Sequence, residues 1–432
     1  MTSTAVLLAA GLGTRMKSTL PKALHRIAGK PMLRHLIDSC AGVFDQVVVV
    51  VGPDMDAVAA AVAPHAVVVQ ADRLGTAHAA LQAAPHFGSG DVAVLYADNP
   101  LIRPDTLRRL LGARRGAGLA LLAMRPADPG RYGRVIADGA TVERIVEWAD
   151  ATPAERAVGL CNAGVLCADA ADFLRWLRAV LPSAVKGEYY LTDCVALARA
   201  EGGRVIAVEA PEAELRGINS RAELADAEAT VQGWLRRAAM DGGATLTAPD
   251  TVFLQADTVL APDVLVGPHV VFGPGVSVGA GTEILPFCHL EGCDVGPGAR
   301  IGPYARLRPG TVTGPGVHIG NFVELKATTL AAGVKVNHLT YLGDTAVGAR
   351  TNVGAGTITC NYDGVHKHRT TIGADVFVGT NATLVAPLAL GDGSFVAAGS
   401  TVTRDVAADA LVLGRAAQVD KPGRAAALRR RD

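Results

Sequence analysis

The chain has 432 residues, half of them hydrophobic, which is enough to form two or more domains. Its seven cysteines form no CxxC pair, so the sequence favours buried thiols over disulfides or a zinc site. Its 41 basic residues balance 41 acidic ones, so the composition excludes a global basic field for nucleic acid or an anionic membrane. The start has no basic leader region, and no stretch approaches the ~20 apolar residues that cross a bilayer, so we expect a cytoplasmic protein.

The first apolar run, residues 5–10, leads into a loop that contains two glycines and several cations. Residues 8–24 read LAAGLGTRMKSTLPKAL. Glycine lets the backbone approach a ligand closely, and Arg15 and Lys22 supply positive charge for phosphate. A dinucleotide-binding fingerprint would need a third glycine where Met16 stands, and a P-loop would need Gly-Lys-Ser/Thr. The loop therefore predicts a phosphate site of another kind.

Buried strands and amphipathic helices alternate along the first half of the chain. The predicted strands are 5–10, 46–51, 67–70, 92–96 and 119–124, and helices such as 31–41 and 104–114 lie between them. This rhythm predicts a doubly wound, Rossmann-like parallel sheet, with ligands at the carboxyl ends of the strands.

A helix is predicted to join the two halves. Apolar residues recur at steps of three and four over residues 221–240, and Asp-Gly-Gly at 241–243 ends the pattern. We place a first domain at 1–222, a linker helix at 223–245 and a second domain at 246–432.

Six-residue spacing characterises the second half. Aliphatic-Gly pairs, with one Phe-Gly, recur within short groups at Val266, Phe272, Val278, Val295, Ile301, Val347, Val353, Ile372 and Val378. This hexapeptide repeat predicts a parallel β-helix in which these side chains point inward and the eighteen residues from Ile301 to Ile319 make one coil. The phase breaks at 361–371, NYDGVHKHRTT, where we expect a loop to leave the prism.

The segment LxxGxGTRM followed by LPK resembles the signature of sugar-phosphate nucleotidyltransferases. Together with QADRLGTAHA, YADNPLI, YGRVI, GEYYLTD, RGIN, ARLRPG, NHLTYLGD and NVGAGTITCNYDG, it resembles the bacterial family of bifunctional N-acetylglucosamine-1-phosphate uridylyltransferases and glucosamine-1-phosphate N-acetyltransferases over almost the whole chain. The resemblance implies a left-handed parallel β-helix in the second half, acetylation of glucosamine-1-phosphate there with acetyl-CoA, and uridylyl transfer from UTP to N-acetylglucosamine-1-phosphate in the first half.

The resemblance also implies a set of uridylyltransferase residues. Those for the nucleotide and its phosphates are Leu8, Ala9, Ala10, Gly11, Arg15, Lys22, Gln70, Gly75, Thr76, Tyr96, Ala97 and Asp98. Gly133, Glu147 and Asn162 would meet the sugar, and Asp98 with Asn219 would hold Mg²⁺, an ion that prefers oxygen ligands. Alone, an Asp after a strand is as often a helix cap, and Asn219 could be a turn residue.

For the acetyltransferase, the family pattern makes His338 the general base, since an imidazole suits proton removal near neutral pH. The alternative is that His338 is a packed core residue. Arg308 and Lys326 would hold the sugar phosphate, and Tyr341 and Asn352 would bond sugar hydroxyls. Acetyl-CoA would meet Ala355, Asn361, Tyr362, Thr380, Ala398 and Arg415, and the basic end KPGRAAALRRRD would either help to hold its phosphates or be a solvated tail. The resemblance implies a homotrimer.

The chain departs from the family pattern at four places: Ala97, Asn99, Trp148-Ala149 and Thr380. The loss of a lysine at 149 removes a charge near the sugar site and could alter the sugar phosphate accepted. Two alternatives therefore stay open: a sugar-nucleotide pyrophosphorylase with a purely structural β-helix, and a non-catalytic scaffold of the same folds.

Overall fold

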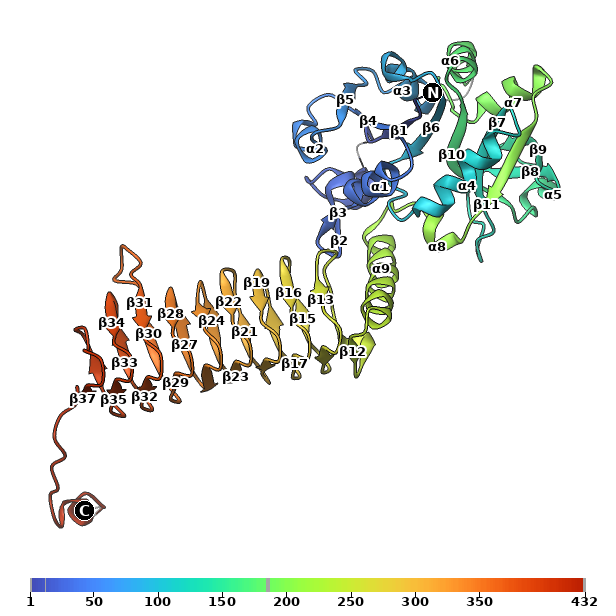
Figure 1. Ribbon diagram of the computed structural model, residues 1–432. Helices are drawn as coiled ribbons and strands as arrows, with labels where there is room; N and C mark the ends of the chain where they lie inside the picture. The colour runs from blue at the N-terminus through green and yellow to red at the C-terminus, as the bar shows by residue number, and fades with distance from the viewer. Residues whose placement is uncertain (1, 12, 184–186, 430–432) are drawn as a thin grey trace. The chain divides into compact units, whose positions relative to one another are not determined.

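The structure, a computed structural model, describes residues 2–11, 13–183 and 187–429 (Figure 1). The chain divides into two units, Met1–Val231 and Gln232–Asp432. The division falls inside helix α9 (Arg221–Asp241), which covers the stretch where the apolar stripe predicts a helix. None of the helices in the described ranges combines the length and apolar character that a membrane span requires.

The first unit is built on a twisted sheet whose strands, within the described residues, follow the order β5-β4-β1-β6-β10-β7-β11-β9-β8. The strands are β1 (Thr4–Leu8), β4 (Gln46–Val51), β5 (Ala66–Val69), β6 (Asp91–Tyr96), β7 (Leu119–Met124), β8 (Arg134–Asp138), β9 (Thr141–Val146), β10 (Cys161–Asp169) and β11 (Val205–Glu209), with a separate pair β2 (Arg26–Ile27) and β3 (Lys30–Pro31).

Helices cover both faces of this sheet, as a doubly wound fold requires. They are α1 (Met32–Ala41), α2 (Asp56–Ala61), α3 (Thr76–Gln82), α4 (Pro104–Arg114), α5 (Pro153–Arg156), α6 (Ala170–Ala179), α7 (Asp193–Ala200) and α8 (Glu212–Leu215). Successive residues of β1 point to opposite faces: Ala5 and Leu7 pack in the core under α1 and α4, and Val6 packs in the core under α3, α6 and α7. The continuous apolar runs of the central strands are buried on both sides for this reason.

The sheet departs from the predicted parallel arrangement at β10, which runs antiparallel between β6 and β7. Cys161, the first residue of β10, pairs with Met124, the last residue of β7. The residues between them form the hairpin β8–β9 and the short helix α5. The chain therefore makes no long crossover back to the end of the sheet where the parallel strands begin. Without that crossover, the returning strand must run antiparallel.

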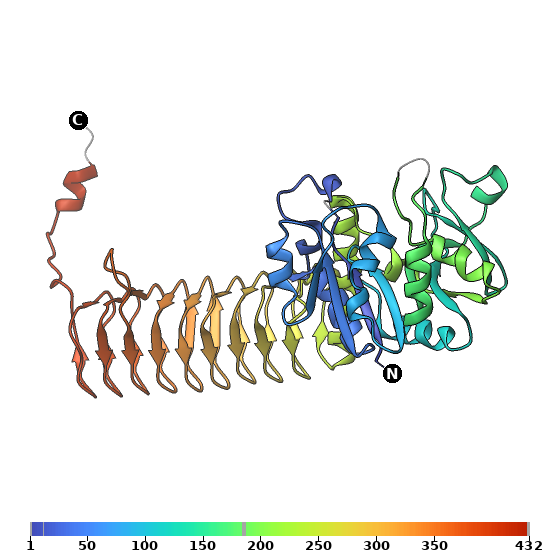
Figure 2. The ribbon, with the colours of Figure 1, turned by 90° about the horizontal axis from the view of Figure 1, so that it is seen from above.

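The second unit is a parallel β-helix with three flat sheets (Figures 1 and 2). One sheet contains β12 (Thr245–Leu246), β14 (Leu265–Val266), β17 (Glu283–Ile284), β20 (Arg300–Ile301), β23 (His318–Asn321), β26 (Lys335–His338), β29 (Asn352–Val353), β32 (Phe377–Val378), β35 (Phe395–Val396) and β37 (Leu411–Val412). The next contains β15 (Val271–Phe272), β18 (His289–Leu290), β21 (Arg306–Leu307), β24 (Glu324–Lys326), β27 (Tyr341–Gly343), β30 (Ile358–Cys360), β33 (Thr383–Val385) and β36 (Thr401–Val402). The third contains β13 (Val259–Leu260), β16 (Val276–Val278), β19 (Cys293–Val295), β22 (Thr311–Thr313), β25 (Thr329–Leu330), β28 (Thr345–Val347), β31 (Thr370–Ile372) and β34 (Leu388–Leu390).

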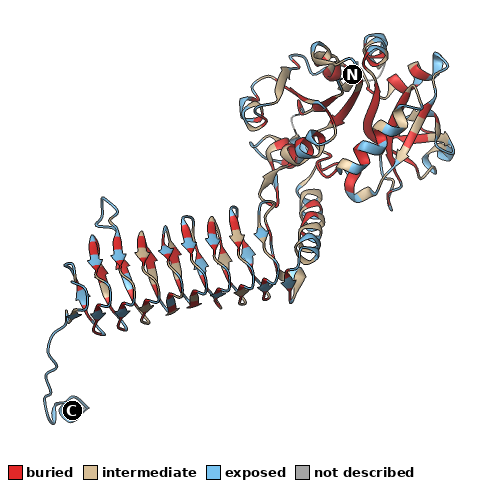
Figure 3. Ribbon diagram, viewed as in Figure 1, coloured by how far each residue is buried: buried red, intermediate tan, exposed pale blue. Residues whose placement is uncertain are grey.

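The hexapeptide prediction is confirmed by the register and by burial. Ile301 pairs with Ile319 on the next coil, and the aliphatic residues of the repeat lie in one continuous core (Figure 3). Between β30 and β31 the chain leaves the prism as a loop over residues 361–369, and Val347 pairs with Ile372, twenty-five residues further on. The unit ends in an exposed segment with α10 (Arg424–Arg429).

All seven cysteines lie in the described part of the chain and are free. Six are buried, and Cys360 is partly exposed, which agrees with the prediction of buried thiols. Burial raises the pKa of Cys194 and Cys293 to about 12, so these thiols are poor nucleophiles at neutral pH.

Candidate functional sites

Two adjoining cavities open at the carboxyl ends of the parallel strands of the first unit. The first has a volume of about 420 Å³, and of the residues that the sequence predicts for the nucleotide it is lined by Leu8, Ala9, Ala10, Gly11, Lys22, Gln70, Gly75, Thr76, Tyr96, Ala97 and Asp98. The second, of about 310 Å³, is lined by Gly133, Glu147, Asn162 and Asn219, the residues predicted for the sugar and the metal. Thr76, Tyr96, Asp98 and Tyr190 line both, so the two cavities share a wall that includes Asp98.

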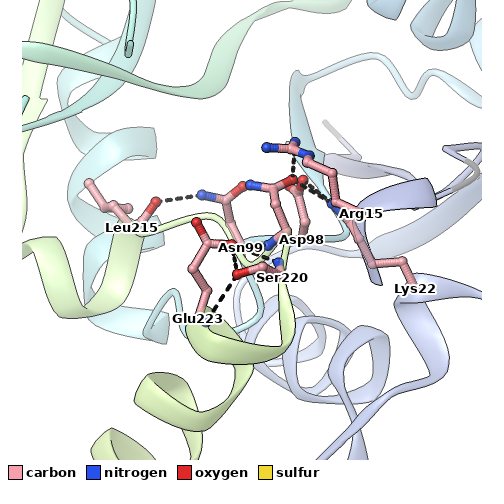
Figure 4. Close-up of polar contacts among 8 residues, drawn as sticks. Arg15, Lys22, Asp98, Asn99, Leu215, Ser220 and Glu223 are labelled. Carbon is pink, nitrogen blue, oxygen red and sulfur yellow. Dashed lines mark hydrogen bonds and ion pairs between the residues drawn. The ribbon is translucent and has the colours of Figure 1, made fainter. Parts of the chain in front are cut away.

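A polar cluster stands at that shared wall (Figure 4). The ammonium of Lys22 donates to Asp98 Oδ2 at 2.6 Å and to Asn219 Oδ1 at 2.9 Å. Arg15, which lines neither cavity, donates from Nη2 to the same Asn219 oxygen at 2.8 Å. The structure therefore brings together four predicted residues that are up to 204 positions apart in the sequence.

The side-chain oxygens of Asp98 and Asn219 both contact the Lys22 ammonium nitrogen. Their positions around that nitrogen indicate that they could also bind one metal ion. Two oxygens within 3 Å of a common point, one of them a carboxylate, are the hard donors that a divalent cation such as Mg²⁺ prefers. Two protein oxygens leave most coordination positions of such an ion to phosphate oxygens and water, which is how Mg²⁺ is usually held.

The turn before α9 places Asn219. The backbone N–H of Ile218 donates to the Asp98 carbonyl at 2.8 Å, which joins the two oxygen-bearing segments. Ser220 and Glu223 exchange hydrogen bonds as a capping box, and Glu223 Oε2 also accepts the Asn219 N–H at 2.6 Å. Burial alone would raise the pKa of Glu223, but these hydrogen bonds lower it overall, so the cap is ionised at neutral pH.

Asn99, one of the departures from the family pattern, is buried beside this cluster (Figure 4). Its amide nitrogen donates to the Leu215 carbonyl at 2.5 Å. The contact ties the loop after β6, which carries Asp98, to the segment that leads to Asn219. Asn99 thus has a structural partner that an aliphatic side chain would lack.

Tyr96 separates the cavities, and the chain makes room for its ring at Gly164. A Cβ at Gly164, where φ is +77°, would lie 2.2 Å from the Tyr96 ring, so this position in the irregular part of β10 requires glycine. Burial raises the pKa of Tyr96 to about 12, which keeps the phenol neutral at physiological pH.

Several residues that line the two cavities were not predicted from the sequence, among them Arg73, Tyr190 and Arg131. Arg73 donates from Nε to the Ala10 carbonyl at 2.9 Å and packs on Gly52. Arg73 and Tyr190 lie inside the quoted motifs QADRLGTAHA and GEYYLTD, so a scan of every polar residue in those motifs would have found them.

Arg131 supplies a positive charge near Trp148-Ala149, where the chain departs from the family pattern. The Trp148 ring has the guanidinium carbons of Arg156 and Arg131 at 4.4 Å and 5.3 Å from its centroid. Arg131 also lines the second cavity, beside Glu147. A cation is therefore present at the predicted sugar site although position 149 carries none.

In the second unit, His338 lies at a corner of the β-helix, and it is exposed. The alternative that it is a packed core residue is therefore wrong. Its carbonyl accepts from the Gly356 N–H of the next coil. The same corner continues through later coils, because Asn381 N–H bonds the Ala355 carbonyl, Gly399 N–H bonds the Thr380 carbonyl and Arg415 Nη1 bonds the Ala398 carbonyl. This corner thus carries the predicted base and four of the residues predicted for acetyl-CoA: Ala355, Thr380, Ala398 and Arg415.

The sheet that follows this corner carries the predicted phosphate-binding cations. Arg308, Lys326 and Tyr341 belong to successive coils on or beside β21, β24 and β27, and Arg308 bonds Glu324 at 2.8 Å. Lys367, from the protruding loop, contacts Lys326 and lowers its pKa. Cations crowded in this way favour an anionic ligand. Neither Lys367 nor Glu324 is among the site residues predicted from the sequence.

Asn361 and Tyr362, both predicted for acetyl-CoA, lie beside the sheet that carries Arg308 and Lys326, whereas Asn352 lies on another sheet. A Cβ at Gly343 would lie 2.4 Å from the Tyr341 hydroxyl and 2.6 Å from the Asn361 amide nitrogen, so these side chains meet over a glycine. Tyr362 lies in the protruding loop and is exposed. Asn352 lies on the neighbouring sheet, between Lys335 and Phe377, so a single chain does not place it with Arg308, Lys326 and Tyr341. Of the basic tail, residues 430–432 lie outside the described residues.

Comparison with known proteins matches both units. Residues 5–162 match the family described as MobA-like NTP transferase domain, and residues 369–404 match the hexapeptide repeat of succinyl-transferase. The protein named Bifunctional protein GlmU from Gluconacetobacter diazotrophicus is 69% identical over 432 residues, covering 99% of this chain and 94% of its own length. Its namesakes from Acidiphilium cryptum and Granulibacter bethesdensis are 63% and 64% identical, each over 99% of this chain and over 99% and 96% of their own lengths.

Proposed function

Because the chain belongs to the bifunctional GlmU family, we propose that it makes UDP-N-acetylglucosamine in two steps. It acetylates glucosamine-1-phosphate with acetyl-CoA and then transfers UMP from UTP to the N-acetylated product, releasing pyrophosphate. We assign uridylyl transfer to residues 1–222 and acetyl transfer to residues 246–432, joined by the linker helix 223–245. The observation that carries the proposal is the identity with relatives across both units, which a shared fold alone would not require.

In the first unit, uridylyl transfer needs no protein nucleophile. A phosphate oxygen of N-acetylglucosamine-1-phosphate attacks the α-phosphorus of UTP, and the bond to the pyrophosphate oxygen breaks. The backbone of residues 8–11 with Gln70, Gly75 and Thr76 would hold the nucleotide in the first cavity, and Gly133, Glu147 and Asn162 the sugar in the second. Lys22 and Arg15, at the shared wall, neutralise charge where the two ligands meet.

Asp98 and Asn219 are the residues that would hold a divalent cation, which we take to be Mg²⁺. When bound, the ion would neutralise phosphate oxygens and help to orient the triphosphate. Lys22, which bridges the two oxygens in this structure, would then turn its ammonium to the phosphates.

In the second unit, His338 removes a proton from the sugar amine as the nitrogen attacks the acetyl carbonyl carbon. The C–N bond forms, the C–S bond breaks, and the coenzyme thiolate takes a proton from the imidazolium. Arg308 and Lys326 hold the sugar phosphate, and the corner from Ala355 to Arg415 holds acetyl-CoA.

Asn352 lies on a different face from the other predicted sugar contacts, so the acetyltransferase site would be completed by a neighbouring chain. We therefore assign a homotrimer, in which the flat faces of three β-helices pack around an axis. Light scattering alongside both activity assays tests this: an active monomer would contradict it.

A product assay tests the whole proposal. With UTP, acetyl-CoA, glucosamine-1-phosphate and Mg²⁺ supplied together, mass spectrometry should find UDP-N-acetylglucosamine. Uridylyl transfer without coenzyme A release would favour the pyrophosphorylase with a structural β-helix. No pyrophosphate release with any nucleotide would favour the scaffold.

A further inference from the structure

The imidazole of His338 has one polar partner that the function above does not use. Its Nδ1 lies 2.7 Å from Oδ1 of Asn321, although the His338 side chain is otherwise exposed. Asn321 stands one coil earlier, seventeen residues back, and the two residues are paired in the ladder between β23 and β26.

The backbone holds the two side chains together. A Cβ on Gly320 would lie 1.9 Å from the Asn337 carbonyl oxygen, so glycine lets β23 approach β26 here. The Leu339 N–H donates to the Asn321 carbonyl at 3.1 Å, and the His338 carbonyl accepts from the Thr340 hydroxyl at 2.8 Å. Both ends of the Asn321–His338 hydrogen bond therefore stand on fixed backbone.

We propose that Asn321 is a positioning residue that holds His338 in the tautomer with hydrogen on Nδ1. An amide oxygen can only accept, so Nδ1 must donate, and the lone pair of the neutral ring is then on Nε2. The inference rests on the proposed function of His338 as the base. It adds which nitrogen takes the amine proton: Nε2, at the exposed edge of the ring.

The alternative tautomer would present an N–H to the substrate and could take no proton from it. Asn321 thus raises the fraction of rings ready to react and fixes their direction, without touching the substrate. Because Asn321 is neutral, it orients the ring without adding a charge beside it.

Charged groups near the pair come from its own and neighbouring strands. His318 lies on β23, Lys335 on β26 and Arg300 on β20. The adjoining β24 carries Glu324 and Lys326, β27 carries Tyr341, and β29 carries no titratable side chain. Burial lowers the pKa of His318, and the charges of Arg300, Lys335 and His338 lower it further. A carboxylate at 321 would add an anion in direct contact with the His338 ring, at the position where Asn321 Oδ1 lies 2.7 Å from Nδ1.

The experiment compares Asn321→Ala, Asn321→Asp and the control Asn337→Ala in the full-length protein. Asn337 is the neighbour of His338 on β26, and its side-chain oxygen has no partner within the described residues. Coenzyme A release with glucosamine-1-phosphate is measured across pH, with uridylyl transfer and melting temperature as checks on folding.

Asn321→Ala should lower kcat for acetyl transfer about 10- to 100-fold, with KM for the sugar phosphate nearly unchanged, which is the usual cost of losing a partner that orients a reacting group. Asn321→Asp keeps an acceptor and should retain most of the rate. Its acid-side limb should move to higher pH, because a carboxylate stabilises the imidazolium. Asn337→Ala should keep the rate and pH profile of the parent.

Three results would overturn the inference. The first is an Asn321→Ala protein with parental rate and pH profile. The second is an Asn321→Asp protein as slow as the alanine variant with no shift, since the amide would then act as a donor. The third is loss in proportion to melting temperature, which is a purely structural effect. A parent without acetyl transfer, or full activity in His338→Ala, would instead refute the proposed function and the inference with it.

Discussion

The two candidate sites are built in opposite ways. In the first unit, side chains from distant segments converge on cavities of about 420 and 310 Å³ at the ends of parallel strands. In the second unit, residues one coil apart line an open corner and an adjacent flat face, and Asn352 stands on another face. The first candidate site lies within one chain, whereas the second is an open surface that a neighbouring chain would close in the homotrimer proposed above.

This difference shows what each architecture offers a reaction. A doubly wound sheet gathers loops at the carboxyl ends of its strands, so residues 204 positions apart can form a hydrogen bond. A β-helix repeats its geometry every coil, so it can place a column of groups in register but cannot wrap around a ligand. Four substitutions should separate the sites, ordered here by expected effect.

The largest effect is expected at the β-helix corner. His338→Ala should cut acetyl transfer by ~10² to 10⁴-fold, the usual contribution of a positioned base, and leave uridylyl transfer near normal. The parent rate should fall on the acid side as the imidazole is protonated, and the variant should lose that limb. Coenzyme A release against pH measures both, with His65→Ala in the other unit as the control. A folded variant with normal acetyl transfer would rule out the base.

Asp98→Ala should do the reverse. It removes the carboxylate that faces Lys22 and the proposed metal, so we expect uridylyl transfer to fall about 10²- to 10³-fold, as when one preorganised electrostatic group is lost, with acetyl transfer kept. Pyrophosphate release is the readout. Asp105→Ala, an exposed carboxylate on α4, is the matched control. Equal loss of both activities in a folded variant would contradict the separation of the sites.

Asn99→Leu tests how the enclosed site is held. The substitution leaves the Leu215 carbonyl without its buried donor, which should cost about 1–3 kcal/mol of unfolding free energy and loosen the link between Asp98 and Asn219. Thermal melting and uridylyl transfer should both fall, with acetyl transfer unchanged. Full stability would mean that the aliphatic side chain repacks and that Asn99 adds nothing.

The smallest effect is expected at Arg131. Arg131 lines the second cavity and is exposed, and an exposed charge contributes up to about 1 kcal/mol to an ionic contact, so Arg131→Ala should raise KM for N-acetylglucosamine-1-phosphate by no more than about 5-fold with little change in kcat. Arg144→Ala, an exposed arginine paired with Glu155, is the control and should leave KM alone. A larger KM effect in the control would remove Arg131 from the sugar site.

The sequence by itself determined the β-helix almost completely. A six-residue spacing has one physical solution, because every aliphatic side chain must face the same narrow core, and the register of Ile301 on Ile319 follows from counting. It also determined the strands at 46–51 and 119–124 and helix 104–114, whose bounds agree with the structure, because continuous apolar runs and stripes mark buried elements. The same coil counting, applied to His338, points to Gly320 and misses Asn321 by one residue, because the coil between β23 and β26 has seventeen residues instead of eighteen.

Only the tertiary structure decided the direction of β10, the contacts of Asn99 and the cation at Trp148. Each depends on the path of the chain between strands. β10 is antiparallel because the β8–β9 hairpin keeps the chain at the end of the sheet where β7 finishes. Arg131, before this hairpin, contacts Trp148, which follows it. Local secondary-structure propensity carries no information about contacts between segments that are distant in sequence, since these contacts form only after the core has packed. The periodic unit could be predicted from spacing, whereas the enclosed site had to be seen.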